Sequence, residues 1–145
     1  MLIETLPIDR CDDAVALWHA AGLTRPWNDP VADLARALDG PSSTVLAAMD
    51  DDRTPDEPLL GTVMVGHDGH RGWVYYLAVT PRRRRRGIGR ALMVGAERWL
   101  TGRVPKLQLM VRTENADAAG FYRRLGYTRS DVLVLARRID RPGVS

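Results

Sequence analysis

The chain has 145 residues, of which 45% are apolar and 27% are charged, and its formal net charge is +3. This length is typical of a single domain, and this composition excludes a disordered or fibrous chain. Cys11 is the only cysteine, which excludes an intramolecular disulfide, and no segment approaches the roughly 18 apolar residues of a membrane span. We therefore expect one domain over residues 1–145, located in the cytoplasm.

The first forty residues predict a short strand followed by two helices. Residues 3–6 can form the strand, and Asp9 is then placed to cap the first helix. Gly22 is positioned to end that helix. Asp29 and Pro30 supply an N-cap and a first-turn proline, which predicts the start of the second helix.

The middle of the chain predicts three consecutive antiparallel strands, because the apolar period changes at Ser43. The strands are expected over residues 44–49, 59–67 and 73–79. The segment 68–72 between the last two contains two glycines and is expected to form a hairpin connection.

The last third alternates helices and strands, with helices predicted over residues 87–100 and 115–125 and strands over 107–111 and 131–138. The expected apolar stripe of the first of these helices consists of Ile88, Ala91, Leu92, Gly95 and Trp99. The whole order predicts an α+β fold, a mostly antiparallel mixed sheet of about six to seven strands with about four helices packed on it.

A basic, glycine-containing turn joins the strand over residues 73–79 to the following helix. Residues 82–86 are an unbroken run of arginines, and Gly87 and Gly89 follow them. Glycine lets the backbone approach a ligand closely, and a helix N-terminus presents unpaired N–H groups together with the positive end of the helix dipole. The turn therefore predicts a phosphate-binding site, although an ordinary loop with a solvated charge run would look similar.

The spacing excludes two familiar phosphate sites. No Gly-Lys pair is present, as a Walker motif would require, and Leu92 stands where a dinucleotide fingerprint needs its third glycine. The turn instead resembles the (Gln/Arg)-x-x-Gly-x-(Gly/Ala) motif of the GNAT acetyltransferases, with Arg84, Gly87 and Gly89 in its fixed places. In that family the turn holds the pyrophosphate of coenzyme A. Many members have glycine after the first arginine of the turn, where this chain has Arg85.

A second segment resembles the other motif of the same family. Asn115 and Ala118 match Asn-x-x-Ala, Tyr122 follows four residues later, and residues 125–127 read Leu-Gly-Tyr. The distance between the two motifs fits one helix and one strand. The resemblance covers nearly the whole chain.

The resemblance is sharper toward the bacterial YpeA-like acetyltransferases. It is carried by residues 25–30, 68–72, 126–127 and 131–133. This narrows the family without identifying the substrate.

The GNAT resemblance implies an acetyl-CoA-dependent N-acetyltransferase that moves acetyl to a primary amine of a small molecule, a peptide N-terminus or a lysine by direct attack, without a metal. It also implies that the backbone of residues 77–79 pairs with the pantetheine arm, and that an amide there polarises the acetyl carbonyl. The coenzyme-binding residues implied are Leu77, Ala78, Val79, Arg84, Arg85, Arg86, Gly87, Ile88, Gly89, Arg90, Asn115 and Tyr122.

The catalytic candidates are Tyr122, His70 and Tyr75. Tyr122 occupies the family's tyrosine position and is expected to donate a proton to the departing thiolate, although by residue type it could equally be a core aromatic. Many relatives place a glutamate base where this chain has Trp73. His70, Tyr75 and Asp68 are the available substitutes, and His70 has the most suitable ordinary pKa. A water relay, or an amine that arrives neutral, would serve as well.

The acceptor is expected near the first two helices and the loop between them. Trp27 could wall the pocket, and Asn28 and Asp29 could contact an ammonium group, but the same residues read simply as a helix start. Asp68 is a further candidate for acceptor contact.

Rival functions fit the sequence less well. The net charge is modest for a nucleic-acid binder, and His67, Asp68 and His70 lack a third metal ligand at a recognisable spacing. A catalytically silent acyl-CoA sensor or partner protein remains open, because the usual glutamate is absent. We expect an amine acceptor as partner, no nucleic acid and no membrane, with the chain a monomer or a homodimer.

Overall fold

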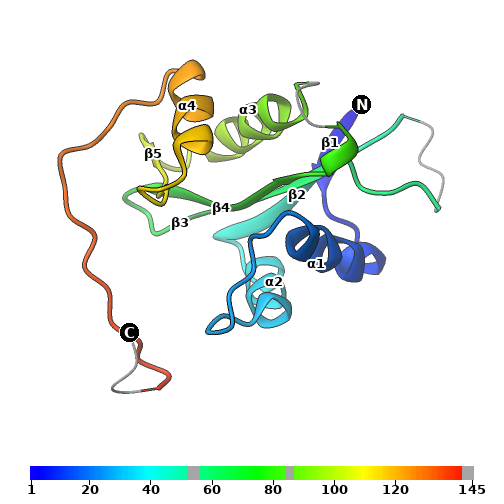
Figure 1. The fold of residues 1–145 in the computed structure, drawn as a ribbon, viewed down its shortest axis with the longest axis horizontal. Coiled ribbons are helices and arrows are strands. Elements are labelled where there is room, and N and C mark those ends of the chain that lie inside the picture. The colour runs from blue at the N-terminus through cyan, green and yellow to red at the C-terminus, as the bar shows by residue number, and fades with distance from the viewer. Residues whose placement is uncertain (52–55, 84–86, 142–145) are drawn as a thin grey trace. The chain divides into compact units, whose positions relative to one another are not determined.

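The structure is a computed structural model that describes residues 1–51, 56–83 and 87–141 (Figure 1). The chain divides into two compact units, Met1–Met110 and Val111–Ser145, which we describe separately. Among the described residues, none of the helices has both the length and the apolar character that a membrane crossing requires.

The first unit is built on one sheet of five strands, in the order β1-β2-β3-β4-β5. The first four pair as antiparallel neighbours and β5 joins parallel to β4. The strands are β1 (Leu2–Thr5), β2 (Ser43–Met49), β3 (Gly61–His67), β4 (Gly72–Val79) and β5 (Leu107–Gln108). The mixed, mostly antiparallel sheet is as predicted, but with fewer strands than the expected six to seven within the described residues.

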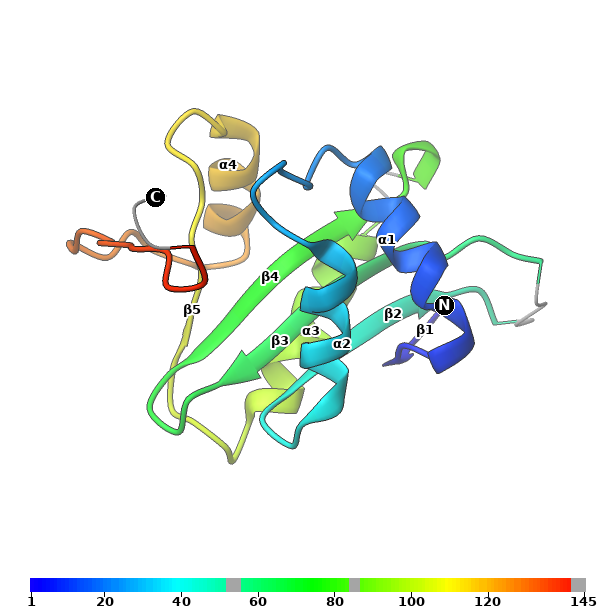
Figure 2. The same cartoon turned by 90° about the horizontal axis from the view of Figure 1, so that it is seen from below.

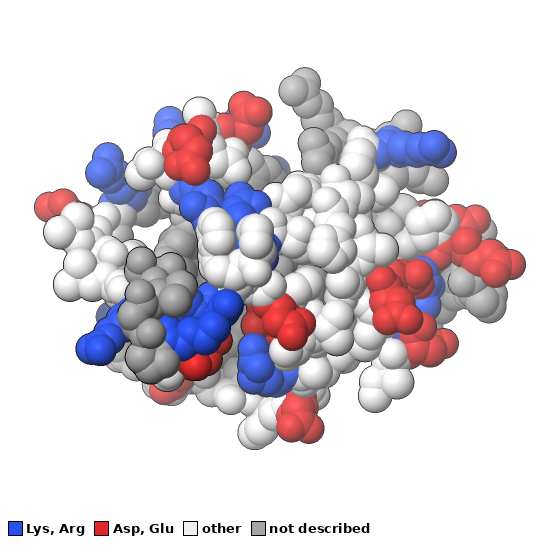
Figure 3. All heavy atoms as spheres, turned by 60° about the horizontal axis from the view of Figure 1, so that its bottom comes forward, with Lys and Arg blue, Asp and Glu red and all other residues white. Residues whose placement is uncertain are grey.

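Helices cover both faces of this sheet (Figures 1 and 2). Helices α1 (Cys11–Ala20) and α2 (Pro30–Asp39) pack on one face, and α3 (Ile88–Leu100) packs on the other. Short 3-10 turns precede α1 at Ile8–Arg10 and follow β4 at Pro81–Arg83. The face drawn in Figure 3 carries side chains of both charge signs.

Local capping explains one helix start and corrects another. Asp29 caps α2 as predicted, because its Oδ1 accepts a hydrogen bond from the amide of Ala32 at 3.1 Å. The predicted cap of α1 by Asp9 is wrong: the N-cap of α1 is Arg10, and no side chain caps it. Asp9 lies inside the 3-10 turn that precedes the helix, one residue too early to reach the free amides of α1.

The buried face of α3 is turned slightly from the predicted stripe. Its fully buried residues are Ile88, Leu92, Met93, Ala96 and Leu100, whereas Ala91, Gly95 and Trp99 are only partly buried. The prediction therefore found the correct helix, but the predicted apolar stripe is rotated about the helix axis relative to the face that is buried.

Gly61 fixes how closely α3 approaches the sheet. A Cβ at this position would lie 2.6 Å from the carbonyl oxygen of Ala78 and 2.9 Å from Cδ1 of Leu92. Gly61 pairs with Val79 of β4, and the side chains of Ile88 and Leu92 from the first turns of α3 lie beside it. This contact holds the helix N-terminus beside the strand that leads to it.

We predict that Gly61→Ala lowers the free energy of unfolding by about 1–3 kcal/mol, because the added methyl overlaps backbone that has little room to move. Urea unfolding followed by circular dichroism measures this. Gly40→Ala is the matched control, because a Cβ there meets nothing within 4 Å and its φ of −128° suits alanine. Equal losses in the two variants would contradict the close packing.

The second unit contains α4 (Ala116–Arg124), which begins at Asn115 as predicted. The Asn115 Oδ1 accepts a hydrogen bond from the amide of Ala118 at 3.1 Å. The Tyr122 ring makes edge contacts with Phe121 and Tyr127, with ring centroids 5.0 Å and 5.9 Å apart.

The strand predicted over residues 131–138 is not formed within the described part of the second unit. The side chains of Val132, Leu133, Val134 and Leu135 are 64–89% exposed. A strand requires a hydrogen-bonded neighbour, and residues 111–141 contain none. The local sequence of residues 131–138 is compatible with a strand, but it cannot supply the partner. The strand expected over 107–111 is likewise reduced to β5.

Candidate functional site

The outer edge of β4 is the first feature of the site. β5 pairs with β4 only at Gly72 and Trp73, whose partners are Leu107 and Gln108. Beyond Trp73, β4 continues to Val79 with no further partner strand on this edge among the described residues of the first unit (Figure 2). Backbone donors and acceptors on such an edge can pair with an extended ligand as if it were another strand.

A β-bulge lies in the same stretch of β4. Thr62 pairs with Ala78 and Met64 pairs with Tyr75, so Tyr76 and Leu77 together stand opposite one residue of β3. Tyr76 has a φ of +52°, the only positive φ outside glycine among the described residues. For a bulky residue this conformation costs on the order of 1–3 kcal/mol and commonly marks a functional segment.

The bulge interrupts the hydrogen bonding between β3 and β4. It also changes the direction of the backbone groups of residues 77–79, which were predicted to bind the coenzyme. Leu77 and Val79 are partly exposed and Ala78 is buried. Sequence reasoning predicted this segment but missed the bulge, since an aromatic residue between strand formers gives no sign of it.

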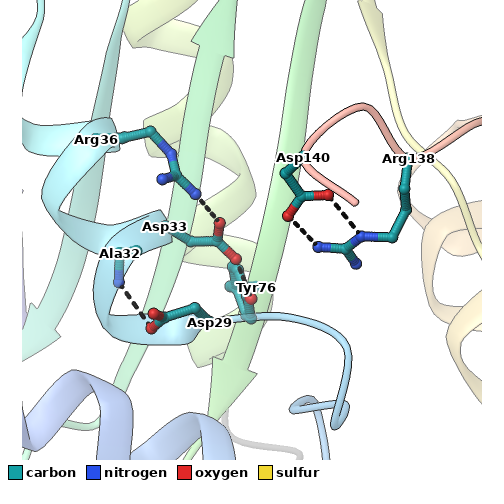
Figure 4. Close-up of polar contacts among 7 residues, drawn as sticks. All are labelled: Asp29, Ala32, Asp33, Arg36, Tyr76, Arg138 and Asp140. Atoms are coloured by element: carbon teal, nitrogen blue, oxygen red, sulfur yellow. Dashed lines mark hydrogen bonds and ion pairs between the residues drawn. The ribbon is translucent and has the colours of Figure 1, made fainter. Parts of the chain in front are cut away.

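Tyr76 is held by side chains from both helices on its face of the sheet. Its ring stacks on Trp18 with centroids 4.0 Å apart and an interplanar angle of 13°. Its hydroxyl donates a hydrogen bond to Oδ2 of Asp33 at 2.7 Å, and Oδ1 of Asp33 accepts one from Arg36 at 2.8 Å (Figure 4). Burial and then the bond to Asp33 raise the pKa of the Tyr76 phenol, with smaller contributions from the charges of Asp33 and Asp29.

Asp33 was not a sequence-based candidate. Its contact with Tyr76 joins residues 43 positions apart, and a carboxylate in the first turn of a helix gives no local sign of a distant partner. It was found only in three dimensions.

The basic turn ends at Gly87, which is the N-cap of α3 and has a φ of +76°. No side chain caps this helix, so none of its first amides is satisfied by a cap. Gly87 and Arg90 are exposed, Gly89 is partly buried, and Ile88 is buried. Arg84, Arg85 and Arg86 lie outside the described residues.

A shallow groove runs along α3 from this turn. Its volume is about 620 Å³, and it is lined by Gly87, Arg90, Val94 and the strand residues Ile3 and Leu46, among others. Gly87 and the side chain of Arg90 thus border a groove at the helix N-terminus.

The hairpin candidates lie at the other end of β4. Asp68 and His70 belong to the turn before the strand, seven residues or more from Leu77, which is roughly 20 Å along an extended chain. The Asp68 carboxylate accepts hydrogen bonds from the amides of Arg71 at 2.8 Å and His70 at 2.9 Å, which lower its pKa. The structure therefore does not bring either residue to Leu77. Nor does any group of three His, Cys, Asp or Glu side chains in the described ranges form a metal site.

The other candidates lie nearer the bulge. Tyr75 adjoins it, its side chain is 44% exposed, and burial of the rest raises the pKa of its phenol. Trp27, 43% exposed, and Asn28 belong to the loop before α2. Asp29 caps that helix, and its charge contributes to raising the Tyr76 pKa, so it lies on the side of the sheet to which Tyr76 points.

Tyr122 has a distinct electrostatic character in the second unit. Burial raises the pKa of its phenol to about 12. The phenol therefore stays protonated at neutral pH. Because it is a weaker acid than a thiol, it is better suited to donate a hydrogen bond to a thiolate than to transfer its proton to it.

Comparison with known protein families decides the assignment. Residues 12–127 match the model of the Acetyltransferase (GNAT) family. The chain belongs to the GNAT acetyltransferase family. It is therefore an N-acetyltransferase with acetyl-coenzyme A as the acetyl donor, which confirms the predicted class of enzyme.

Solved structures place the GNAT fold on nearly the whole chain. The aminoglycoside acetyltransferase AAC(6')-Iy, in complex with a bisubstrate analogue of coenzyme A, has a TM-score of 0.77 and 17% identity, over 94% of this chain and 97% of its own. A protein described as a transcriptional regulator from Bacillus halodurans C-125 has a TM-score of 0.80 and 16% identity, over 94% and 99%.

A third similar structure is an aminoglycoside acetyltransferase from an uncultured soil metagenomic sample, in complex with sisomicin. It has a TM-score of 0.75 and 18% identity, over 94% of each chain. Identities this low establish the GNAT fold and leave the acceptor of this acetyltransferase undetermined.

We predict that the free energy of unfolding of this acetyltransferase loses a contribution from Tyr76 as pH rises above about 10. The folded state holds the phenolic proton more tightly than the unfolded state, so the contribution is complete below the ordinary tyrosine pKa and is lost as pH rises toward the raised one. Urea unfolding at a series of pH values measures it. The slope against pH should be shallower in Tyr76→Phe, and identical slopes would contradict the assignment.

Proposed function

We propose that this protein transfers an acetyl group from acetyl-coenzyme A to a primary amine of a small molecule, a peptide N-terminus or a lysine, by direct attack of the amine on the thioester. The observation that carries the proposal is the edge of β4 beyond Trp73. Among the described residues of the first unit, this edge has no partner strand, contains a bulge, and leads to a helix N-terminus without a side-chain cap. An extended arm fits the edge, and a phosphate fits the helix terminus.

The coenzyme would be held mainly by the main chain. The edge of residues 77–79 would pair with the pantetheine arm, and an amide beside the bulge would donate to the carbonyl oxygen as charge develops there. The amides of Ile88, Gly89 and Arg90 would bind the diphosphate, helped by the charge of the Arg90 side chain. Arg84, Arg85 and Arg86 are included on the motif alone.

The motif positions of the second unit complete the coenzyme set. We propose that Asn115, besides capping α4, contacts the coenzyme, and that Tyr122 donates a hydrogen bond to the departing thiolate. Both rest on their places in the motif, and the single domain over residues 1–145 is supported by a family match that spans both units.

The acceptor would enter on the face of the sheet covered by α1 and α2. Asp29 and Asp33 carry negative charge there, and Trp27 offers an exposed aromatic surface, a combination that favours a cationic amine. Two of the similar structures are aminoglycoside acetyltransferases, which makes polyamine-like small molecules the first acceptors to test.

Trp73 leaves the general base to another group. Of the three substitutes, Tyr75 is the one adjacent to the bulge, whereas His70 and Asp68 lie at the far end of β4. A water molecule that relays the proton, or an amine that enters neutral, needs no side-chain base, and either is compatible with the same geometry.

We predict that Gly87→Ala weakens coenzyme A binding by about tenfold, because the methyl group strains a φ of +76° and displaces the amides that follow. Calorimetric titration with coenzyme A measures this. Gly102→Ala is the matched control, since Gly102 has a φ of +83° and equally open surroundings at the other end of α3. An unchanged affinity in Gly87→Ala would overturn the diphosphate site.

We expect thiol release from acetyl-coenzyme A to accelerate in the presence of at least one class of amine. The panel would contain sisomicin, simple polyamines, a peptide with a free N-terminus and a peptide with an internal lysine. Coenzyme binding without release by any amine would instead favour a silent acyl-CoA sensor. Salt-sensitive DNA binding without coenzyme binding would reject both.

A further inference from the structure

Tyr76 occupies a conformation that it would not adopt alone. A bulky side chain at a φ of +52° within a strand is disfavoured by steric contact with its own backbone. Such residues persist only where the surrounding structure over-determines them. The question is which contacts hold Tyr76 and what that placement does.

Three elements fix Tyr76 at three different points. From α1, Trp18 stacks on the ring at 4.0 Å, and from α2, Asp33 accepts the hydroxyl hydrogen bond at 2.7 Å. From β3, the hydroxyl of Thr62 donates to the carbonyl oxygen of Tyr76 at 3.4 Å. The ring, its polar tip and the backbone carbonyl are therefore all held.

Two of the three holding groups are fully buried, and the third is partly exposed. Trp18 and Thr62 are both 0% exposed, and Nε1 of Trp18 donates to Oγ1 of Thr62 at 2.8 Å. Asp33 is fixed to the exposed side chain of Arg36 in the next turn of α2. The ring and the carbonyl of Tyr76 are thus held by buried groups, and its hydroxyl is held by a partly exposed carboxylate that is paired with a surface arginine.

The conformation of Tyr76 affects the residues that follow it in β4. The torsion angles of Tyr76 determine the direction of the Leu77 and Ala78 peptide groups, which lie in the segment proposed to meet the acetyl-pantetheine arm. The diphosphate site at Gly87 lies beyond the end of the strand and does not depend on Tyr76. A change in the contacts that hold Tyr76 would therefore affect the position of the acetyl group more than the affinity for the coenzyme.

We propose that Asp33 and the Tyr76 side chain are positioning residues for acetyl transfer: reaching from α2, the Asp33 carboxylate holds the Tyr76 hydroxyl and thereby keeps the bulge of β4 in the conformation that presents its amides to the acetyl carbonyl. This inference rests on the proposed function. The phenol does not take part in the chemistry and acts through the backbone.

The variants separate backbone positioning from a chemical role of the phenol. Tyr76→Phe and Asp33→Ala each remove the hydrogen bond, and Asp33→Asn keeps an acceptor oxygen. Tyr76→Asn lacks the phenol but tolerates positive φ far better than phenylalanine. Asp39→Asn, an exposed carboxylate at the end of α2, is the matched control.

The experiment uses the full chain with coenzyme A and acetyl-coenzyme A as probes. Calorimetry first measures coenzyme A binding, because wild type that does not bind it would overturn the proposed function and this inference together. The amide resonances of Leu77 and Ala78 are then compared between the two complexes in isotope-labelled protein, and the slow thiol release from acetyl-coenzyme A without an acceptor gives a rate. Thermal unfolding reports whether each variant is folded.

In Tyr76→Phe and Asp33→Ala we expect the acetyl-dependent shift difference to shrink and the rate of thiol release to fall by about fivefold, with coenzyme A affinity within about twofold of wild type. Asp33→Asn, Tyr76→Asn and Asp39→Asn should keep most of the shift difference and the rate. The double variant Asp33→Ala with Tyr76→Phe should be no worse than either single variant, because both remove the same bond.

Two results would overturn the inference while leaving coenzyme binding intact. Wild-type shifts and rates in both Tyr76→Phe and Asp33→Ala would show that the bond does not position the bulge. A loss in Tyr76→Asn as large as in Tyr76→Phe, in a folded protein, would show that the phenol itself is required. Tyr76→Phe, which keeps the aromatic ring, and Asp33→Asn keep the test decisive if Tyr76→Asn does not fold.

Discussion

Every backbone N–H and C=O group that is withdrawn from water needs a hydrogen-bond partner. Among the described strands, this requirement is met for β4 by its neighbours at the start of the strand but not along the whole of its outer edge. At its start the strand is paired on both sides, with β3 and with β5, and it is an ordinary inner strand. Further on, β5 no longer pairs with it, and the described part of the first unit contains no strand to take its place. A molecule that can pair with the backbone gains hydrogen bonds along this stretch without displacing any part of the sheet.

The other features of the first unit support that single edge. Gly61 lets α3 pack closely against the end of β4, and Gly87 turns the chain into that helix with its first amides uncapped. On the opposite face, α1 and α2 supply the ring and the carboxylate that hold Tyr76. One face of the sheet thus carries the helix that follows the basic turn, and the other carries the contacts that hold Tyr76.

Sequence reasoning succeeded where the determinants were local. Asp29 and Asn115 are caps whose hydrogen bonds reach only three residues along the chain, and both were predicted from residue type. The helix that begins after Gly87 was predicted from its apolar stripe, and the family from two short motifs. The narrower YpeA-like resemblance stays a prediction.

The failures have a common physical origin in distant partners. The last strand was expected over residues 131–138, but pairing depends on a neighbouring strand that the local sequence cannot supply. The bond between Asp33 and Tyr76, and the bulge it accompanies, join segments that nothing in the local sequence connects. Asp9 failed for a smaller reason, since a 3-10 turn displaced the N-cap of α1 by one residue, to Arg10.

The anchoring of Tyr76 by α2 bears on how a new acceptor preference could evolve in such an enzyme. If the start of α2 shifted or rotated, the hydrogen bond between Asp33 and Tyr76 would be lost. We therefore expect the position of this helix to be constrained during evolution. In the loop before this helix, Trp27 and Asn28 are exposed. We therefore expect substitutions that change the acceptor pocket to occur in the loop more often than at the start of α2.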